Sequence, residues 1–315
     1  MSALAPRGLT WTVLRVHRAG LLAGTALFAL SAAALVWLYG AGQEAARTDT
    51  PCGSTGLPSC SPFPPGLLDD FSGNMSRAAT LLAWAPPLLA GFAGAALICG
   101  ELRRGTAGLV WTQSVTPRRW LATELLVPAV GIAAGLTALS LLYRRARGTD
   151  AAALGDRWYY PDVFVALGPA LPAYALLALA LGALGALLTR RVLPAGGIAL
   201  AVTGLVMVLG ERWRDRLWPP AEVVWKNSRG EVGGGSWGLE HGLVTPTGRR
   251  IPECLEAGTP GQAWCYEARS ARQWYELYHP GSHFWPLQLV ETGIVLALAA
   301  LATLIAFRVL RRHHA

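Results

Sequence analysis

Long apolar stretches separated by polar, arginine-bearing segments dominate the hydrophobic pattern of this 315-residue chain. Charged side chains are almost excluded from these stretches, which contain only Glu124 and Glu291. Each has 18–26 residues. At a rise of about 1.5 Å per residue, a helix of this length crosses a hydrocarbon core roughly 30 Å thick. Because a span must satisfy its backbone hydrogen bonds internally, the pattern predicts membrane helices. They cover residues 21–39, 78–99, 121–142, 163–188, 192–209 and 289–307.

The pattern therefore predicts an all-α integral membrane protein with six transmembrane helices. Five of them lie within residues 21–209 and the sixth follows a long extracytoplasmic segment. The remaining predicted parts are a cytoplasmic interfacial N-terminal segment (1–20), outer loops (40–77 and 143–162), an inner loop (100–120), the extracytoplasmic segment (210–288) and a cytoplasmic basic tail (308–315).

Two alternatives to membrane helices were weighed. Buried helices of a large soluble protein rarely run past about 18 residues without a charge. A secretory signal peptide is the alternative for the first stretch, but its 19 uninterrupted apolar residues exceed the usual hydrophobic region of about 7–15 residues. We interpret it as a retained helix.

The distribution of arginine predicts the orientation, because short cytoplasmic loops carry an excess of positive charge. With the N-terminus inside, the short inner segments hold twelve arginines and the two shorter outer loops hold six. This predicts a multi-pass protein of the cell membrane with both termini cytoplasmic. The cluster Arg144, Arg145 and Arg147 lies on the outer side and is the weakest point of the topology.

The overall composition fits the same interpretation. Hydrophobic residues make up 53% of the chain and charged residues 15%, with a net charge of +8. A basic protein of this kind is a candidate for nucleic-acid binding. Here the arginines gather at the predicted inner face, where they meet anionic lipid headgroups. We therefore predict contact with membrane lipid and no nucleic-acid partner.

The five cysteines divide according to the predicted sides of the membrane. Cys52 and Cys60 share the first outer loop, Cys254 and Cys265 share the long outer segment, and Cys99 ends the second span on the inner side. Paired cysteines are typical of an oxidising compartment. Four cysteines allow three connectivities, of which we favour the two pairs within each loop. A zinc site is the alternative, although neither spacing matches the usual ligand pairs.

Catalytic and metal-binding motifs are missing from the sequence. It contains no G-x-x-x-x-G-K-[ST], and its single lysine is Lys226 in an outer segment. It therefore cannot hold nucleotide phosphates in a Walker A loop, and we predict neither enzymatic activity nor catalytic residues. No H-E-x-x-H occurs. His279 and His283 have helical spacing, but Pro280 and Gly281 between them favour a plain loop over a metal site.

The inner segment between Gly100 and Trp120 carries more than the arginines that topology requires. An apolar patch around Trp111 lies beside glycine breaks and a Thr-Pro turn. This favours a surface that docks on a cytosolic partner. An interfacial-anchor role for Trp111 and Trp120 is the alternative.

This segment resembles the loop between the second and third spans of ABC-2 type transporter permeases, especially of the subfamily common in high-GC bacteria. The likeness extends to residues 11–18 before the first span and 279–293 before the last, and the six spans follow in the same order. The resemblance rests on Glu101, Gly105, Thr106, Leu109, Trp111, Thr112, Gln113, Ser114, Val115, Thr116, Arg118, Arg119, Trp120 and Leu121.

The resemblance implies a permease subunit of an ATP-driven exporter, with two copies forming the membrane part. A separate cytosolic ATPase subunit would bind ATP and Mg, so this chain would need no cofactor. The residues that would couple to that subunit are Glu101, Gly105, Thr106, Leu109, Trp111, Thr112, Gln113, Ser114, Arg118, Arg119 and Trp120.

One residue departs from the family pattern, because Glu124 stands where the family usually has lysine or arginine. Ionisable groups within a span are costly, so Glu124 and Glu291 are expected to face the bundle interior or a wet interface. Glu291 matches the family pattern.

Other functions stay open at this point. The chain could be a structural or regulatory membrane protein that recruits a cytosolic partner without transporting anything. A membrane-integral enzyme would need polar residues clustered within the spans. The substrate is not identified, since a drug, a peptide or a lipid fits apolar spans.

Proline and glycine mark expected flexible or closely packed points in the spans. Gly131 and Gly135 form a G-x-x-x-G that would let another helix approach closely. Helix kinks are expected at Pro86-Pro87, Pro128, Pro169, Pro172 and Pro194.

Overall fold

The computed structural model describes residue 15 and residues 18–47, 67–104, 116–148, 157–226, 230, 232–233, 235–252 and 273–312. The chain divides into two compact units. The helical unit comprises Met1–Glu211 and Gln288–Ala315, and the strand unit comprises Arg212–Leu287. All four cysteines of the expected disulfides, Cys52, Cys60, Cys254 and Cys265, lie outside the described residues, whereas Cys99 is a buried free thiol.

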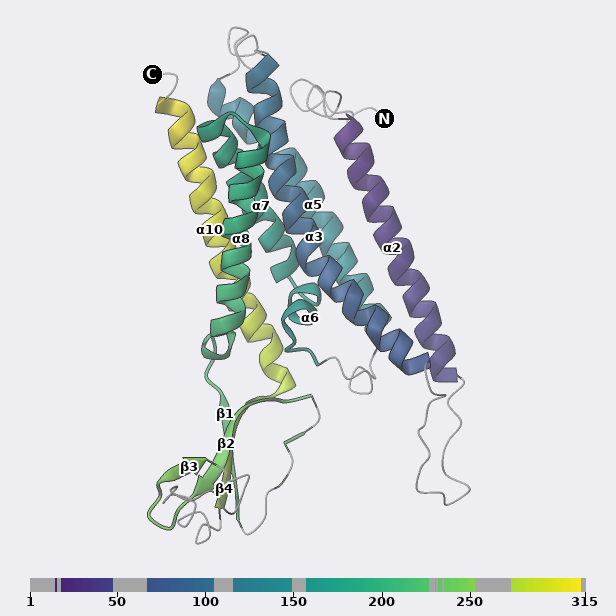
Figure 1. Cartoon of the computed structure of the whole chain (residues 1–315), viewed down its shortest axis with the longest axis vertical. Helices are drawn as coiled ribbons and strands as arrows, with labels where there is room; N and C mark the ends of the chain where they lie inside the picture. The colour runs from purple at the N-terminus through teal and green to yellow at the C-terminus, as the bar shows by residue number, and fades with distance from the viewer. Residues whose placement is uncertain are drawn as a thin grey trace, which may run out of the picture. The chain divides into compact units, whose positions relative to one another are not determined.

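Within the described residues, six helices are long and apolar enough to cross a membrane, which confirms the predicted number of spans. The fourth predicted span, 163–188, is covered by a short helix, α6, followed by the longer α7 (Figure 1). The helices are α2 (Arg18–Arg47), α3 (Leu67–Arg104), α5 (Pro117–Arg147), α6 (Pro161–Ala166), α7 (Ala170–Thr189), α8 (Val192–Trp213) and α10 (Phe284–Arg312).

The most deeply buried helix is α7, which packs mainly on α3. The most apolar 18-residue window of α7 is 72% buried, against 11% for that of α2. Glycines allow this close packing. A Cβ at Gly94 would collide with the backbone of Leu179 in α7, and one at Gly182 would collide with the backbone of Gly91 in α3.

Within the described residues, no helix backbone makes the expected close approach at Gly131 and Gly135. A Cβ at Gly131 would meet nothing within 4 Å, and one at Gly135 would meet only the ring of Phe28 at 3.5 Å. Close backbone contacts between helices within the described residues lie instead at the α3 and α7 glycines and at Gly185, which approaches the α8 backbone at Ala195. Small residues are needed there because the two backbones nearly touch.

The prolines differ in what they do to the helices. Pro86 and Pro87 lie inside α3, and Pro128 lies inside α5. By contrast, Pro172 and Pro194 lie in the first turns of α7 and α8. Backbone N–H groups of a first turn have no partner within the helix, so these two prolines remove no helical hydrogen bond. The expectation of kinks at Pro172 and Pro194 is therefore wrong.

One end of the helical unit collects the segments that were predicted to be inner. The end of α3, the start of α5, the α7–α8 turn and the end of α10 lie at the same end (Figure 1). One buried cluster joins them, and it includes Ile98, Trp120, Leu187 and Leu310. We refer to this end as the predicted inner end, and to the opposite one as the predicted outer end.

The strand unit contains a four-stranded antiparallel sheet that the sequence analysis did not predict. Its order is β1-β4-β2-β3. Side chains alternate between half-buried and exposed positions along β1, as expected for a sheet with one covered face. A tight turn joins β2 to β3, with Gly248 in the left-handed region at φ 81°. The strands are β1 (Ala221–Lys226), β2 (Trp237–Val244), β3 (Arg250–Pro252) and β4 (Gln273–His279), flanked by 3-10 turns η2 (Arg214–Arg216) and η3 (Gly281–His283).

Candidate functional site

The two helices that border the inner loop are joined by a direct hydrogen bond. The indole Nε1 of Trp120 in α5 donates to Glu101 Oε2 near the end of α3, at 2.5 Å. Thr116 caps α5, because its Oγ1 accepts from the backbone N–H of Arg119 at 3.4 Å, and Pro117 begins the helix. A proline at the first helical position removes no helical hydrogen bond. The base of the loop is thus closed by a part-buried side-chain contact.

The residues expected to couple to an ATPase occupy different environments. Arg118 and Arg119 are exposed on the first turn of α5. The side chain of Trp120 is 1% exposed and packs in the buried cluster at this end, so it faces the interior. The remaining expected coupling residues lie outside the described part of the chain, namely Gly105, Thr106, Leu109, Trp111, Thr112, Gln113 and Ser114.

The two carboxylates within the spans are both buried. Glu124 is 1% exposed and lies one helical turn after Trp120 on α5. Glu291 is 2% exposed and accepts a hydrogen bond from the Tyr174 hydroxyl at 2.9 Å. Leu310 packs in the same cluster as Trp120, and Glu291 precedes it on α10 by a helical distance of about 29 Å. The two carboxylates therefore belong to separate sites.

A polar site forms where the fourth span is broken. Helix α6 ends at Ala166 and α7 begins at Ala170. Within an α-helix the carbonyl of Phe164 would accept from Gly168, but Gly168 N donates to Val165 O instead. The break therefore leaves buried backbone groups in need of partners, which is costly away from water.

A single side chain from α10 satisfies both sides of this break. Gln288 is fully buried. Its Nε2 donates to the carbonyl of Phe164 at 2.5 Å, and its Oε1 accepts from the backbone N–H of Ala170 at 3.3 Å. A Cβ at Gly168 would approach the Gln288 carboxamide to 2.5 Å. The glycine is thus required for the amide to reach the break.

The short helix α6 is also fixed to α3. Thr80 Oγ1 donates to Asp162 Oδ2 at 2.6 Å, and Trp84 Nε1 donates to Asp162 Oδ1 at 3.1 Å. Asp162 lies in the first turn of α6, where a negative charge is favoured by the helix dipole. The broken span is therefore held by α3 on one side and by α10 on the other.

Sequence reasoning missed Gln288, Asp162 and Tyr174. The sequence did contain a signal for the break, because Gly168-Pro169 interrupts an apolar run and a Gly-Pro pair typically marks a turn or a loop. Gln288 stands in the 279–293 stretch that carried the family likeness, yet no role was predicted for it. Its partners are more than 100 positions away in the sequence, so no local pattern could identify them.

Two histidines of the strand unit lie in contact at the end of β4. His279 Nδ1 is 3.0 Å from His283 Nδ1, and His279 Nε2 is 3.0 Å from the backbone oxygen of Asp215. Burial lowers the pKa of His279 below its usual 6.5; the nearby His283 lowers it further, while the bond to the Asp215 backbone opposes both. The sequence analysis expected a plain loop here, whereas a 3-10 turn brings the two rings together.

The sheet carries further polar chemistry on one face. Tyr275 donates its hydroxyl hydrogen to Glu240 Oε1 at 2.6 Å. Burial and this carboxylate raise the pKa of Tyr275 to about 12. Arg250 lies over the Tyr275 ring at 5.1 Å and pairs with Glu222 at 2.6 Å. The ion pair is largely exposed, so it contributes at most about 1 kcal/mol.

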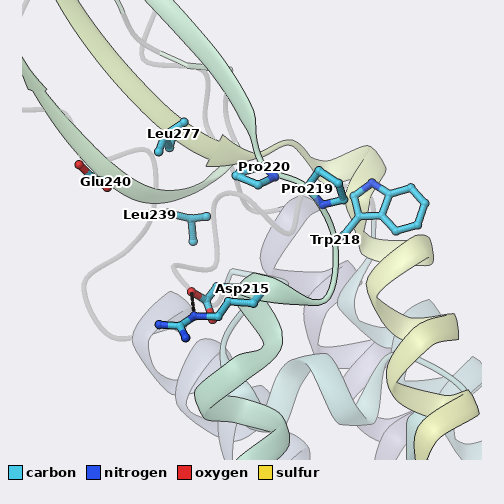
Figure 2. A pocket seen from close by; sticks show the side chains of 8 residues that line it. Asp215, Trp218, Pro219, Pro220, Leu239, Glu240 and Leu277 are labelled. Atoms are coloured by element: carbon cyan, nitrogen blue, oxygen red, sulfur yellow. Dashed lines mark ion pairs between the residues drawn. The ribbon is translucent and has the colours of Figure 1, made fainter. Parts of the chain in front are cut away.

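An open pocket of about 420 Å³ lies elsewhere in the strand unit. Figure 2 shows Trp218, Pro219 and Pro220 beside Leu239 and Leu277 around it. Asp215 lies at its edge and faces the exposed Arg216 at 3.9 Å. The lining combines apolar side chains with three charged ones, Asp215, Arg216 and Glu240.

Comparison with known protein families yields a match over most of the chain. The sequence model of a family described as ABC-2 membrane transporter related matches residues 22–214, which is more than half of the chain. The matched region includes the first five spans, the inner loop and the broken fourth span. No curated protein and no solved structure matches the chain.

Proposed function

Because the chain belongs to the ABC-2 membrane transporter related family, we propose that it is the permease subunit of an ATP-driven exporter of the cell membrane. It is a multi-pass membrane protein and the membrane component of an ABC transporter. Membership implies partnership with an ATPase subunit. In our proposal this separate cytosolic subunit binds ATP and Mg, and two copies of the permease enclose the substrate path.

The inner loop is the proposed docking surface for that ATPase. Arg118 and Arg119 are exposed at its end, where they are available to acidic groups of a partner. The contact between Glu101 and Trp120 holds the two ends of the loop together. A push on the loop would therefore move the ends of α3 and α5 as one body.

Helix α3 provides a physical route from this loop to the broken span. It carries Glu101 near one end and contacts Asp162 of α6 through Thr80 and Trp84. The distance along the helix from Glu101 to Trp84 is about 26 Å. Between these points the glycine contacts of α3 with α7 leave little room for sliding. This continuous packing is the observation that best supports coupling between the loop and the spans.

A charge-reversal experiment tests the docking role. The variant Arg118→Glu/Arg119→Glu is compared with Arg308→Glu/Arg311→Glu, which reverses two exposed charges near the end of α10, also at the predicted inner end. We expect the first variant to lose co-purification of the ATPase subunit and to lower permease-stimulated ATP hydrolysis by tenfold or more. The second should retain both. Full stimulation in the first variant would refute the docking role.

The proposed orientation has its own test. A reporter that is active only in the cytoplasm is fused after Gly148, in the predicted outer loop, or after Arg312. We expect activity only from the Arg312 fusion. An active Gly148 fusion would overturn the proposed topology, and with it the extracytoplasmic position of the strand unit.

A further inference from the structure

The histidine pair of the strand unit has a defined arrangement of hydrogens. A carbonyl oxygen can only accept, so the contact of His279 Nε2 with Asp215 O requires a hydrogen on Nε2. In the neutral ring, the lone pair is then on Nδ1, which faces His283. The hydrogen between the two Nδ1 atoms must therefore come from His283.

This arrangement matches that of a metal-binding histidine. Such a residue usually donates its second ring N–H to a carboxylate or a backbone carbonyl, which fixes the ring and keeps the other nitrogen free to bind. His279 makes this contact with Asp215. Its ring is fully buried and lies 5.4 Å from the ring of Trp237, so its orientation is set by packing.

We propose that His279 and His283 form a two-histidine site for a divalent transition-metal ion that prefers imidazole, such as Zn²⁺ or Cu²⁺. At metal–nitrogen distances of about 2.0–2.1 Å, two ligands of a tetrahedral ion lie about 3.3 Å apart. The observed separation of 3.0 Å between the Nδ1 atoms is close to this value, and the rings would turn so that both lone pairs point at the ion. His283 would move its hydrogen from Nδ1 to Nε2, so the ion binds two neutral rings without net release of a proton.

The ion would reach the site from the side of His283. This residue is half-buried, whereas His279 is fully buried. Within the described residues, no group of three or more His, Cys, Asp or Glu side chains is placed to hold a metal. A site with two protein ligands binds more weakly than a closed structural zinc site, which uses four.

Binding would fasten the start of α10 to the sheet. His279 is the last residue of β4, and His283 is the last residue of the turn that leads directly into α10. His279 also holds η2 through Asp215. A metal ion at this point would thus join three segments of the strand unit.

A metal titration tests the proposal. The full-length protein is purified in detergent with a histidine-free tag, its thiols are blocked, and Zn²⁺ is titrated against a chromophoric competitor. We expect wild-type protein to bind one more Zn²⁺ than His283→Gln at micromolar concentration, or to bind it at least tenfold more tightly. The controls His241→Gln and His313→Gln/His314→Gln should match wild type. Equal binding by wild type and His283→Gln would overturn the proposal.

Electron paramagnetic resonance of the protein with bound Cu²⁺ tests the two-histidine site independently. Cu²⁺ binds imidazole more tightly than Zn²⁺ does. At one equivalent of Cu²⁺, we expect a paramagnetic resonance spectrum with coupling to two imidazole nitrogens, reduced to one nitrogen or lost in His283→Gln. Tryptophan fluorescence, to which Trp237 beside the pair contributes together with the other twelve tryptophans, checks that the variant is folded. A two-nitrogen spectrum that survives in the folded variant would place the copper elsewhere and refute the site.

Discussion

Replacing Gln288 by leucine should destabilise the helical unit more than a single hydrogen-bonded side chain ordinarily would. Leucine keeps much of the volume but removes both polar contacts, to Phe164 O and to Ala170 N. Each buried backbone group left without a partner costs about 1–3 kcal/mol, so the pair costs about 2–6 kcal/mol. Part of this loss of stability is offset, because the Gln288 amide no longer has to be removed from water on folding. We expect a net loss of about 2–4 kcal/mol.

The assay is thermal unfolding of the purified protein in detergent, followed by tryptophan fluorescence. For a unit of this size, a loss of 1 kcal/mol lowers the midpoint by about 2–4 °C, so Gln288→Leu should lower it by roughly 4–16 °C. The matched control is Leu289→Ala, which truncates the neighbouring side chain that is 61% exposed. A midpoint for Gln288→Leu equal to that of the control would show that the break does not depend on the amide.

A double-mutant cycle isolates the contact with Gly168. Gly168→Ala alone should destabilise, because its Cβ would press on the Gln288 carboxamide. In a Gln288→Ala background that collision is absent, so the same change should cost less. Neighbouring residues commonly show such coupling of about 0.5–3 kcal/mol. Strictly additive effects would contradict the described geometry.

Three further predictions follow from the packing and the pKa values. Gly94→Ala should lower the unfolding midpoint because its Cβ would meet a helix backbone, whereas Gly100→Ala on the same helix, with nothing within 4 Å, should not. His279 has a lowered pKa, so the unfolded chain takes up a proton before the folded one does. The strand unit should be fully stable above about pH 6.5 and lose stability as the pH falls below it, and His279→Gln should reduce this dependence. Absorbance at 295 nm should show one tyrosine titrating near pH 12 that is missing in Tyr275→Phe; with this raised pKa, the Tyr275 contribution to stability is lost as the pH rises from 10 towards 12.

The six spans could be predicted because a membrane helix is specified by composition over a local window. The exclusion of charge is visible in each stretch, and no partner needs to be known. The break at 167–169 could not be predicted with its consequences, because a Gly-Pro pair signals an interruption but not what repairs it. That repair comes from Gln288, whose partners are 118 and 124 positions away.

The helix contacts show the same limit of local patterns. The spacing of Gly131 and Gly135 fits a helix-packing motif, yet the backbones that nearly touch belong to α3 and α7 at Gly94 and Gly182. Glycine allows two helix backbones to approach closely because it has no side chain. Which glycine is used depends on which helices are neighbours, and that is a property of the whole bundle.

The strand unit was missed for a related reason. Its central strand β4 pairs with β1 and β2, which precede it by about 50 and 35 positions. Short strands that pair over such distances have no local signature as strong as a span. For the histidine pair, Pro280 and Gly281 correctly argued against an α-helix. The absence of an α-helix did not exclude contact between the two histidine rings, because a 3-10 turn also brings them together.

The contacts of α10 differ between its two ends, and this difference suggests where the helical unit can move. Near the predicted inner end, Ala306 and Leu310 are buried in the apolar cluster. Near the predicted outer end, Gln288 and Glu291 hold the helix through hydrogen bonds to α6 and α7. Hydrogen bonds can be exchanged for water or for a polar ligand, whereas dry apolar packing cannot be replaced in this way. At Gln288 and Glu291, water or a polar ligand could therefore replace the contacts that hold α10, whereas the apolar contacts of Ala306 and Leu310 have no such substitute.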